Sequence, residues 1–290
     1  MSAPLLEGTP FPGFEVVPDA ARAALIVVHG IAEHGERYRH VMQALAAKGI
    51  ACFVYDQQGH GRTSGIRTHV ENFTEFAQDL KSVAAVIGMR HPGLPRFIWG
   101  HSMGSVIVTL AALDSKDLAR GFVTSGSALD ALPVLKGPMG AGLNVANRWL
   151  PKLRIPLKVD ARVLTQVEEL QREHMQDPLV PRSASLRLLH GFAVACARCK
   201  ENLNSIVAPW LAIHGAADTV CPVSGSRRLI EGIASSDKEL IVYPGLLHEP
   251  HNENEAARSR MFDAMARFIL KRAEPSRPAG EEARLSNEAM

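Results

Sequence analysis

Six short apolar runs alternate along the chain with longer segments whose apolar residues recur at helical spacing. The runs are rich in Val, Ile and Phe, and several of them are followed by Gly or Asp. Continuous apolar runs of this length are typical of strands that are buried on both faces of a parallel sheet. We therefore expect strands at residues 25–28, 51–55, 97–99, 122–124, 210–213 and 240–243.

The longer segments carry apolar residues at positions i, i+3, i+4 and i+7, which is the spacing of one helix face. This spacing predicts helices around residues 38–45, 73–87 and 261–269, and Gly49 follows the first of them as a helix stop. Strands that alternate with helices form βαβ units. The pattern therefore predicts an α/β fold with a mostly parallel, doubly wound sheet.

The alternation breaks down between residues 129 and 200, where we expect helices and no strand. Within this stretch, residues 131–158 hold five basic residues, no acidic residue and four prolines. We interpret 129–200 as an insertion over the top edge of the sheet, between core segments 1–128 and 201–272. The remaining residues, 273–290, are polar and poor in large apolar groups, which predicts a disordered tail.

Composition limits the class of protein and its partners. The 32 basic residues nearly balance the 30 acidic ones, whereas a nucleic-acid-binding protein usually has a clear basic excess. No apolar run reaches the roughly 18 residues of a membrane span. Residues 1–18 lack the charged and apolar regions of a signal peptide. We therefore expect a cytoplasmic protein that does not bind nucleic acid; the oligomeric state stays open.

The four cysteines do not form a recognisable metal or redox motif. Cys196 and Cys199 lie three residues apart in a helical pattern, so they share one face of the predicted helix. No second pair stands at the spacing of a zinc site. We expect reduced, buried thiols, and neither a metal nor a cofactor.

A Gly-x-Ser-x-Gly sequence at residues 100–104 contains the candidate nucleophile, Ser102. It follows the strand expected at 97–99 and precedes a helix expected at 105–113. In a strand–turn–helix context, such a turn lifts the serine hydroxyl off the sheet and points a helix N-terminus at the reacting oxygen. A purely structural turn is the alternative, and the flanking strand and helix favour the nucleophile.

A serine hydroxyl needs a positioned base, and in this arrangement the acid and then the histidine follow the serine along the chain. Two histidines, His248 and His251, follow the last expected strand, in a loop of the kind where such sheets place ligand chemistry. We predict His248 as the base and keep His251 as the alternative. Asp218 follows the strand at 210–213 and would orient the base, with a helix N-cap as its alternative role.

Two main-chain N–H groups are candidates for the oxyanion hole. One belongs to Met103, the residue after the nucleophile, and the other to Ile31, in the loop after the first buried strand. The neighbouring His29 and His101 are expected to make structural hydrogen bonds.

Several sequence blocks together resemble the monoacylglycerol lipase and lysophospholipase-like group of α/β-hydrolases, of the serine aminopeptidase S33 type. These blocks are HGIAEH at 29–34, DQQGHGRTSG at 56–65, GHSMG at 100–104 and YPGLLHEPHNE at 243–253. The resemblance implies the α/β-hydrolase fold, a Ser102–Asp218–His248 triad and oxyanion donors at Ile31 and Met103. It also implies that residues 129–200 form a helical cap over an apolar acyl tunnel.

Members of this group hydrolyse monoacylglycerols, lysophospholipids or other medium- to long-chain carboxylic esters. The resemblance therefore implies a serine ester hydrolase that acts on a small acyl ester or lipid. It also implies that Glu33 and His34 brace the oxyanion loop. Ser105 departs from the group, because many members have a third glycine there, and we expect this to change packing rather than chemistry.

Three questions of function stay open at this point. A thioesterase, a peptidase or an acyltransferase would use the same triad, and a ligand-binding protein can be built on a hydrolase scaffold. The apolar and basic stretch 131–158, with Trp149, suits peripheral contact with an anionic lipid surface. The alternative for this stretch is a solvated basic rim over an ordinary pocket.

Overall fold

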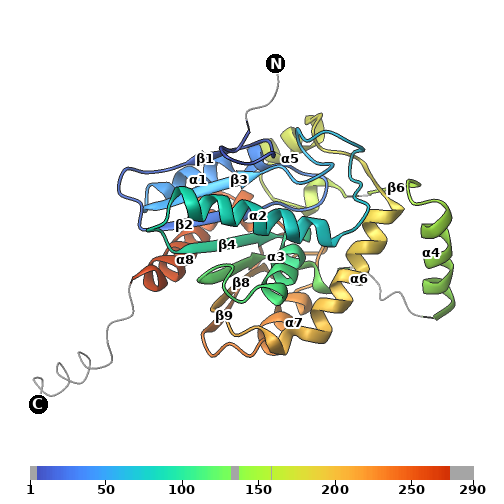
Figure 1. The fold of residues 1–290 in the computed structure, drawn as a ribbon. Coiled ribbons are helices and arrows are strands. Elements are labelled where there is room, and N and C mark those ends of the chain that lie inside the picture. The colour runs from blue at the N-terminus through green and yellow to red at the C-terminus, as the bar shows by residue number, and fades with distance from the viewer. Residues whose placement is uncertain (1–4, 132–136, 158, 275–290) are drawn as a thin grey trace, which may run out of the picture.

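A computed structural model describes residues 5–131, 137–157 and 159–274, and within them seven strands form one central sheet (Figure 1). The strand order is β1-β3-β2-β4-β5-β8-β9. All neighbouring strands are parallel except β1, which is antiparallel to β3. The strands are β1 Gly13–Val16, β2 Ala23–Val28, β3 Ile50–Tyr55, β4 Arg96–His101, β5 Gly121–Ser125, β8 Trp210–Gly215 and β9 Lys238–Tyr243.

Six of these strands match the six apolar runs, so the prediction of a mostly parallel sheet is confirmed. The strand that the pattern did not predict is β1. It is an edge strand whose residues are only half-buried, so it lacks a continuous apolar run. Its pairing with β3 aligns Gly13 with Tyr55, and a Cβ atom on Gly13 would lie 2.3 Å from Val54 O. Contact with the neighbouring strand, rather than local sequence, thus decides its position.

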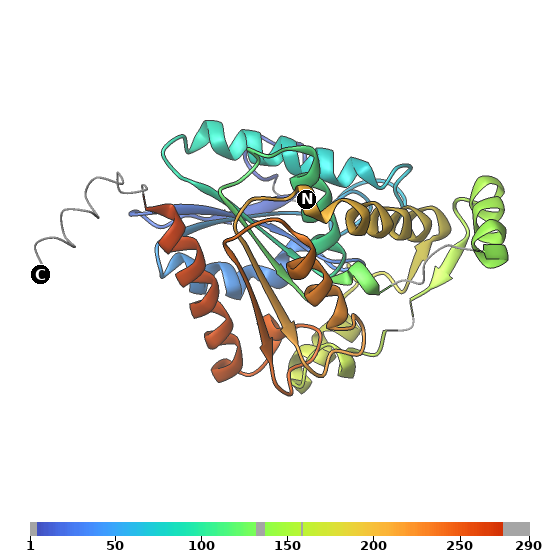
Figure 2. The same cartoon turned by 90° about the horizontal axis from the view of Figure 1, so that it is seen from below.

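Helices cover both faces of the sheet, as a doubly wound fold requires (Figure 2). One face is covered by α1 Arg39–Ala46 and α8 Glu255–Ala273, which bury Met42, Leu45 and Met261. The other is covered by α2 Thr74–Arg90, α3 Met103–Asp114 and α7 Ser224–Gly232. Short 3₁₀ helices join the elements at η1 Gly35–Tyr38, η2 Ala128–Asp130, η3 Ala161–Val163, η4 Leu203–Ser205 and η5 Pro250–Asn252.

The chain between β5 and β8 lies outside the sheet (Figure 1). It contains α4 Gly137–Trp149, β6 Arg154–Pro156, α5 Glu168–Gln176, β7 Ser183–Ser185 and α6 Leu186–Asn202. The helix expected around Cys196 and Cys199 is α6, and both cysteines are buried on it.

The expectation of no strand between 129 and 200 is wrong, because β6 and β7 pair as a small antiparallel sheet. Each strand has three residues, which is too short to produce a period-2 pattern. Tertiary contacts define the pair instead: the Arg154 guanidinium reaches Ser183 Oγ at 2.9 Å and Thr68 Oγ1 at 2.8 Å.

The last described helix, α8, runs through Ala273, one residue into the stretch expected to be a tail. Residues 275–290 of that expected tail lie outside the described residues. Among the described helices, none combines the length and the apolar character needed to cross a membrane.

Candidate active site

Ser102 lies at the sharp turn between β4 and α3. Its backbone has φ 53° and ψ −121°, in the left-handed region that residues with a side chain rarely adopt. The turn leaves no room beside the flanking glycines. A Cβ atom on Gly104 would lie 2.1 Å from Val28 O, and one on Gly100 would lie 2.3 Å from Gly104 O. Residues 100–104 therefore form the strained strand–turn–helix elbow that the sequence predicts.

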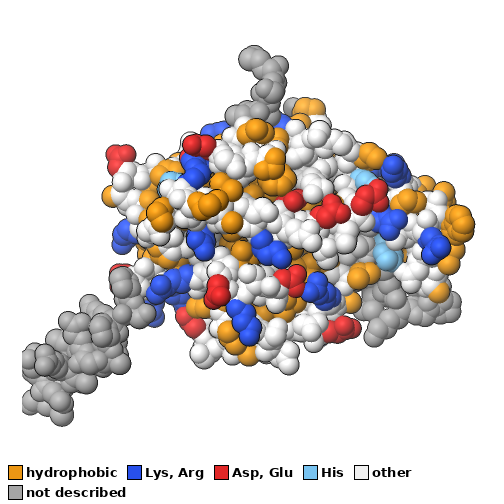
Figure 3. Space-filling view, in the orientation of Figure 1, with side chains coloured by type: hydrophobic (Ala, Val, Ile, Leu, Met, Phe, Trp, Pro, Cys, Tyr) orange, Lys and Arg blue, Asp and Glu red, His pale blue; other side chains and the backbone are white. Residues whose placement is uncertain are grey.

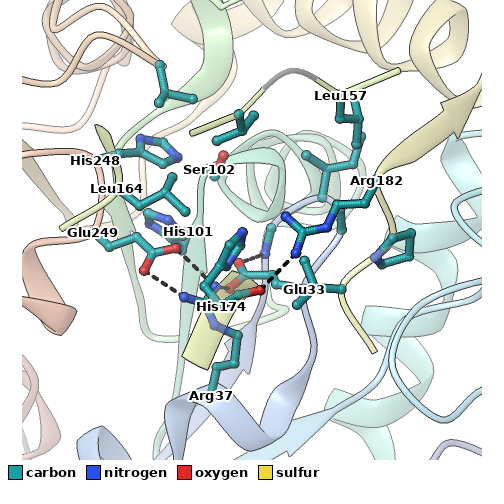
Figure 4. A pocket seen from close by; sticks show the side chains of 17 residues that line it. Glu33, Arg37, His101, Ser102, Leu157, Leu164, His174, Arg182, His248 and Glu249 are labelled. Atoms are coloured by element: carbon teal, nitrogen blue, oxygen red, sulfur yellow. Dashed lines mark hydrogen bonds and ion pairs between the residues drawn. The ribbon is translucent and has the colours of Figure 1, made fainter. Parts of the chain in front are cut away.

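His248 lies in the loop after β9 and pairs with Asp218, which follows β8. His248 Nδ1 is 2.8 Å from Asp218 Oδ2, and both side chains are buried. The His248 ring lies next to Ser102 at the wall of the same pocket (Figure 4). The structure thus brings together three residues that are 30 or more positions apart in the chain.

Asp218 is built to remain ionised. Burial acts to raise the pKa of Asp218, but hydrogen bonds from His214 and His248 outweigh burial, and the pKa lies below its ordinary value. Oδ1 also accepts from Val220 N at 2.8 Å and from Cys221 N at 2.9 Å. The alternative capping role therefore coexists with the orienting role, because each carboxylate oxygen serves one of them.

An ionised Asp218 fixes the tautomer of His248. A carboxylate only accepts, so Nδ1 of His248 must carry the hydrogen of the 2.8 Å bond. Nε2 is then free of hydrogen and can accept a proton. This is the form that a general base requires.

His251, the alternative base, lies in a different environment. It is fully buried, stacked on Tyr38 at 5.1 Å and edge-on to Trp99 at 5.4 Å between ring centroids. Neither of its ring nitrogens has a hydrogen-bond partner within the described parts of the chain. Burial lowers the pKa of His251 to about 3. The geometry therefore favours His248 over His251.

The candidate oxyanion loop follows β2 and lies directly against the elbow. A Cβ atom on Gly30 would lie 3.0 Å from Ser102 Cβ, so the close approach needs glycine at this position. Within residues 5–131 and the other described ranges, neither Ile31 N nor Met103 N donates to a protein acceptor. An N–H without a protein acceptor is what an oxyanion role at either position requires.

The neighbouring histidines have the structural contacts expected of them. His29 Nδ1 is 2.8 Å from Gly30 O, and His29 Nε2 accepts from Gln57 N at 3.1 Å. His101 Nδ1 is 3.0 Å from Ser125 Oγ. Burial lowers the pKa of His29 to about 3, so this ring is neutral and suited to bracing the loop.

A buried ion cluster supports the oxyanion loop and the histidine loop together. Glu33 Oε1 accepts from Gly30 N and from Tyr38 Oη. The Arg37 guanidinium bridges Glu33 Oε2 at 2.9 Å and Glu249 Oε2 at 2.8 Å (Figure 4). Glu249 is the residue after His248. The expected bracing role of Glu33 thus has a structural basis, and sequence reasoning missed the roles of Arg37 and Glu249.

Burial and the Arg37 cation shift the pKa values of the two glutamates in opposite directions. Burial raises the pKa of Glu33, although Arg37 acts in the opposite direction. Burial also acts to raise the pKa of Glu249, but Arg37 outweighs it and the pKa lies well below its ordinary value. Nearby, His34 Nε2 is 2.8 Å from Asp177 Oδ2, which ties the same loop to the end of α5.

Sequence reasoning also missed Gly126, which lies under the His248 ring. Its φ is 53°, and a Cβ atom would be 3.0 Å from His248 Cε1. A glycine directly after a buried strand is a signal that could have pointed to this position.

A pocket opens above Ser102 and encloses about 590 Å³ that protein atoms do not fill, part of it open to solvent (Figure 4). The lining divides into two kinds. Apolar side chains come from Ile31, Leu157, Val159, Leu164, Val180 and Val220, and polar ones from Glu33, Arg37, His174, Arg182 and Glu249.

All four cysteines are free and buried, as expected. Burial raises the pKa of Cys196 to about 12 and raises that of Cys199 well above its ordinary value. Thiols held in this state are packing groups rather than nucleophiles.

A strained serine elbow beside a buried histidine–aspartate pair is the arrangement found in serine hydrolases with the α/β-hydrolase fold. The comparison with known families agrees. The chain belongs to the family described as serine aminopeptidase, S33, whose model matches residues 19–255.

Several of its relatives are monoacylglycerol or monoglyceride lipases. The chain is 34% identical to the monoacylglycerol lipase of Mycolicibacterium smegmatis, covering 81% of this chain and 84% of the relative. It is 30% identical to the monoglyceride lipase of Homo sapiens, covering 87% of this chain and 83% of the relative. The crystal structure of Paleococcus ferrophilus monoacylglycerol lipase superposes with a TM-score of 0.78 at 26% identity, covering 90% of this chain and 99% of that one. The chain is therefore an esterase similar to monoacylglycerol lipases.

Proposed function

We propose that this enzyme hydrolyses monoacylglycerols through an acyl-enzyme formed on Ser102. The observation that carries the proposal is the His248–Asp218 pair beside the strained Ser102 elbow. Two relatives that match 81% and 87% of this chain are named monoacylglycerol lipase and monoglyceride lipase, which supports this substrate class.

The reaction follows from the roles of these groups. Nε2 of His248 takes the proton of Ser102 Oγ as the oxygen attacks the ester carbonyl. The N–H groups of Ile31 and Met103 stabilise the negative charge that develops on the carbonyl oxygen. His248 then protonates the leaving alcohol and afterwards activates the water that releases the fatty acid.

The pocket is lined by both apolar and polar side chains, as an ester with one apolar and one polar part requires. We propose that the acyl chain lies along Leu157, Leu164 and Val220, where few polar atoms need water. The glycerol part then faces Glu33, Arg37 and Glu249. We further propose that residues 129–200 act as the cap of this pocket, since Leu157, Leu164 and Val180 all come from that segment.

Release of fatty acid from 1-monoacylglycerols of several chain lengths tests the proposal, with wild type compared against Ser102→Ala. Release by the wild type alone supports it, and the preferred length measures the usable apolar pocket. Retained activity in Ser102→Ala contradicts the assignment of the nucleophile. A wild type that cleaves only acyl-CoA thioesters or lysophospholipids contradicts the substrate class while leaving the serine in place.

We also propose that the enzyme rests on anionic lipid surfaces through α4 and the turn after it. Trp149 is 74% exposed, and Val145, Leu150 and Leu153 are exposed beside it. Arg148 and Lys152 lie among them, and residues 131–158 contain no acidic residue. Figure 1 shows α4 projecting from the molecule, and Figure 3 shows hydrophobic and basic side chains together at that end. Apolar groups that enter the lipid and cations that meet its phosphates act in the same direction.

Co-sedimentation with phosphatidylglycerol vesicles at low salt tests this contact. We expect Trp149→Ala to weaken binding and Met89→Ala, an equally exposed residue at the end of α2, to leave it unchanged. Absence of wild-type binding, or equal loss in both variants, contradicts the proposal.

For the compartment, we propose the cytoplasm, since four unpaired cysteines within one chain suit a reducing environment. Cell fractionation with an antibody to the chain tests this directly, and recovery outside the cytoplasm contradicts it.

A further inference from the structure

Ser105, the residue that departs from the group's third glycine, is fully buried and makes two side-chain hydrogen bonds. Its hydroxyl donates to Ser102 O at 2.6 Å. The same hydroxyl accepts from Ala128 N at 3.2 Å, where η2 begins after β5. A glycine at this position has no group that makes either bond.

The bond to Ser102 O bears on the oxyanion hole through the geometry of one peptide unit. The carbonyl of Ser102 and the N–H of Met103 belong to the same planar peptide and point in opposite directions. Any rotation of this plane turns the Met103 N–H away from the oxygen it would stabilise. Whatever holds Ser102 O therefore also aims the N–H of Met103.

Two donors from one residue hold this carbonyl. Ser105 N donates to Ser102 O at 2.9 Å, and Ser105 Oγ donates to the same oxygen at 2.6 Å. Because Ala128 N occupies the acceptor side of the hydroxyl, the hydroxyl hydrogen is directed at Ser102 O. Donation to a carbonyl also polarises its peptide, which strengthens the N–H on the other side as a donor.

We propose that Ser105 is a positioning residue of the oxyanion hole, which orients and polarises the Ser102–Met103 peptide so that the Met103 N–H meets the developing charge. The proposal rests on the function proposed above, since it needs Met103 as an oxyanion donor. Ser105 itself touches no reacting atom. Its bond to Ala128 N also couples this peptide to the point where the chain leaves the sheet for residues 129–200.

The test compares Ser105→Ala with a matched change one helical turn further along α3. Thr109 is also fully buried, and its hydroxyl donates to a main-chain oxygen, Ser105 O, at 2.7 Å. Thr109→Val removes that hydroxyl at nearly constant shape without touching the Ser102–Met103 peptide. Ser105→Thr keeps a hydroxyl at the first position and serves as the rescue variant.

Three quantities are measured for each variant: kcat and KM on a soluble ester, the rate constant of labelling by a fluorophosphonate, and the melting temperature. We expect Ser105→Ala to lower kcat and the labelling rate about tenfold each with KM nearly unchanged, because the lost interaction acts in the transition state. Thr109→Val should leave both rates within about twofold of the wild-type values, even if it lowers the melting temperature as much as Ser105→Ala does. Ser105→Thr should recover most of the lost rate.

Equal rates in Ser105→Ala and Thr109→Val overturn the positioning role. A Ser105→Ala variant that raises KM but keeps kcat and the labelling rate overturns it as well. If Ser105→Ala does not fold, Ser105→Gly decides by the same criteria, because glycine is the residue of many members of the group. Full activity in Ser102→Ala would instead contradict the proposed function, so the two failures are distinguishable.

Discussion

Replacing Asp218 with asparagine exchanges one carboxylate oxygen for an NH₂ group and tests the orientation of the base. In the wild type, Oδ1 accepts from Val220 N and Cys221 N, and Oδ2 accepts from His248 Nδ1. The single oxygen of an asparagine is held by the two main-chain donors. Its NH₂ group then faces His248.

This arrangement forces His248 into the wrong tautomer. Nδ1 must accept from the NH₂ group, so the ring hydrogen moves to Nε2, which can no longer take the proton of Ser102. The equivalent change in the serine-protease triad lowers kcat by about 10⁴-fold. We expect a loss of the same order here, which corresponds to about 5 kcal/mol of barrier.

Steady-state hydrolysis of a chromogenic ester measures the loss, with a melting curve for each variant as the test of folding. Asp237→Asn is the matched control. It makes the same chemical change at an exposed aspartate whose partner is Arg272, at 2.7 Å. We expect the control to keep wild-type kcat. A folded Asp218→Asn variant that keeps kcat within about tenfold would refute the tautomer argument.

Three further changes test the surroundings of the site. His251→Phe should keep the ester hydrolysis rate. Because burial lowers the pKa of His251 to about 3, the wild type should lose unfolding free energy as the pH falls from about 6 to 4. His251→Phe should lessen this loss by up to about 1.4 kcal/mol per pH unit, as measured by denaturant titration. Arg37→Met should lower stability by about 3–5 kcal/mol, measured in urea, because Glu33 and Glu249 lose their shared cation. Gly126→Ala should lower kcat about tenfold at unchanged fold, seen by circular dichroism, since the new Cβ displaces His248.

The sign of the His251 effect follows from proton binding in the two states. The unfolded histidine takes up a proton below about pH 6.5, whereas the folded ring stays neutral until about pH 3. Unfolding therefore becomes more favourable as the pH falls through this window. An equal pH dependence in wild type and His251→Phe would contradict this account, and a loss of ester hydrolysis in that variant would restore His251 as a candidate base.

Local patterns in the sequence were sufficient for the sheet and for much of the site. A buried parallel strand needs a continuous apolar run, so β2, β3, β4, β5, β8 and β9 are visible without a structure. The elbow is visible because its strained backbone and close packing demand glycine at fixed positions around Ser102. The order of acid and histidine along the chain then pointed to Asp218 and His248, which the structure brings within 2.8 Å.

What depends on partners distant in the chain was decided by the tertiary structure alone. The strands β1, β6 and β7 are short and only partly apolar, and they exist through pairing with other segments. Arg37 joins Glu249 across 212 positions, and Ser105 joins Ala128 across 23. Such contacts leave no periodic trace, because a single hydrogen bond or ion pair constrains one residue at each end. The sequence by itself therefore determined six strands of the central sheet and the candidate reacting groups, and the tertiary structure decided the contacts that hold those groups in place.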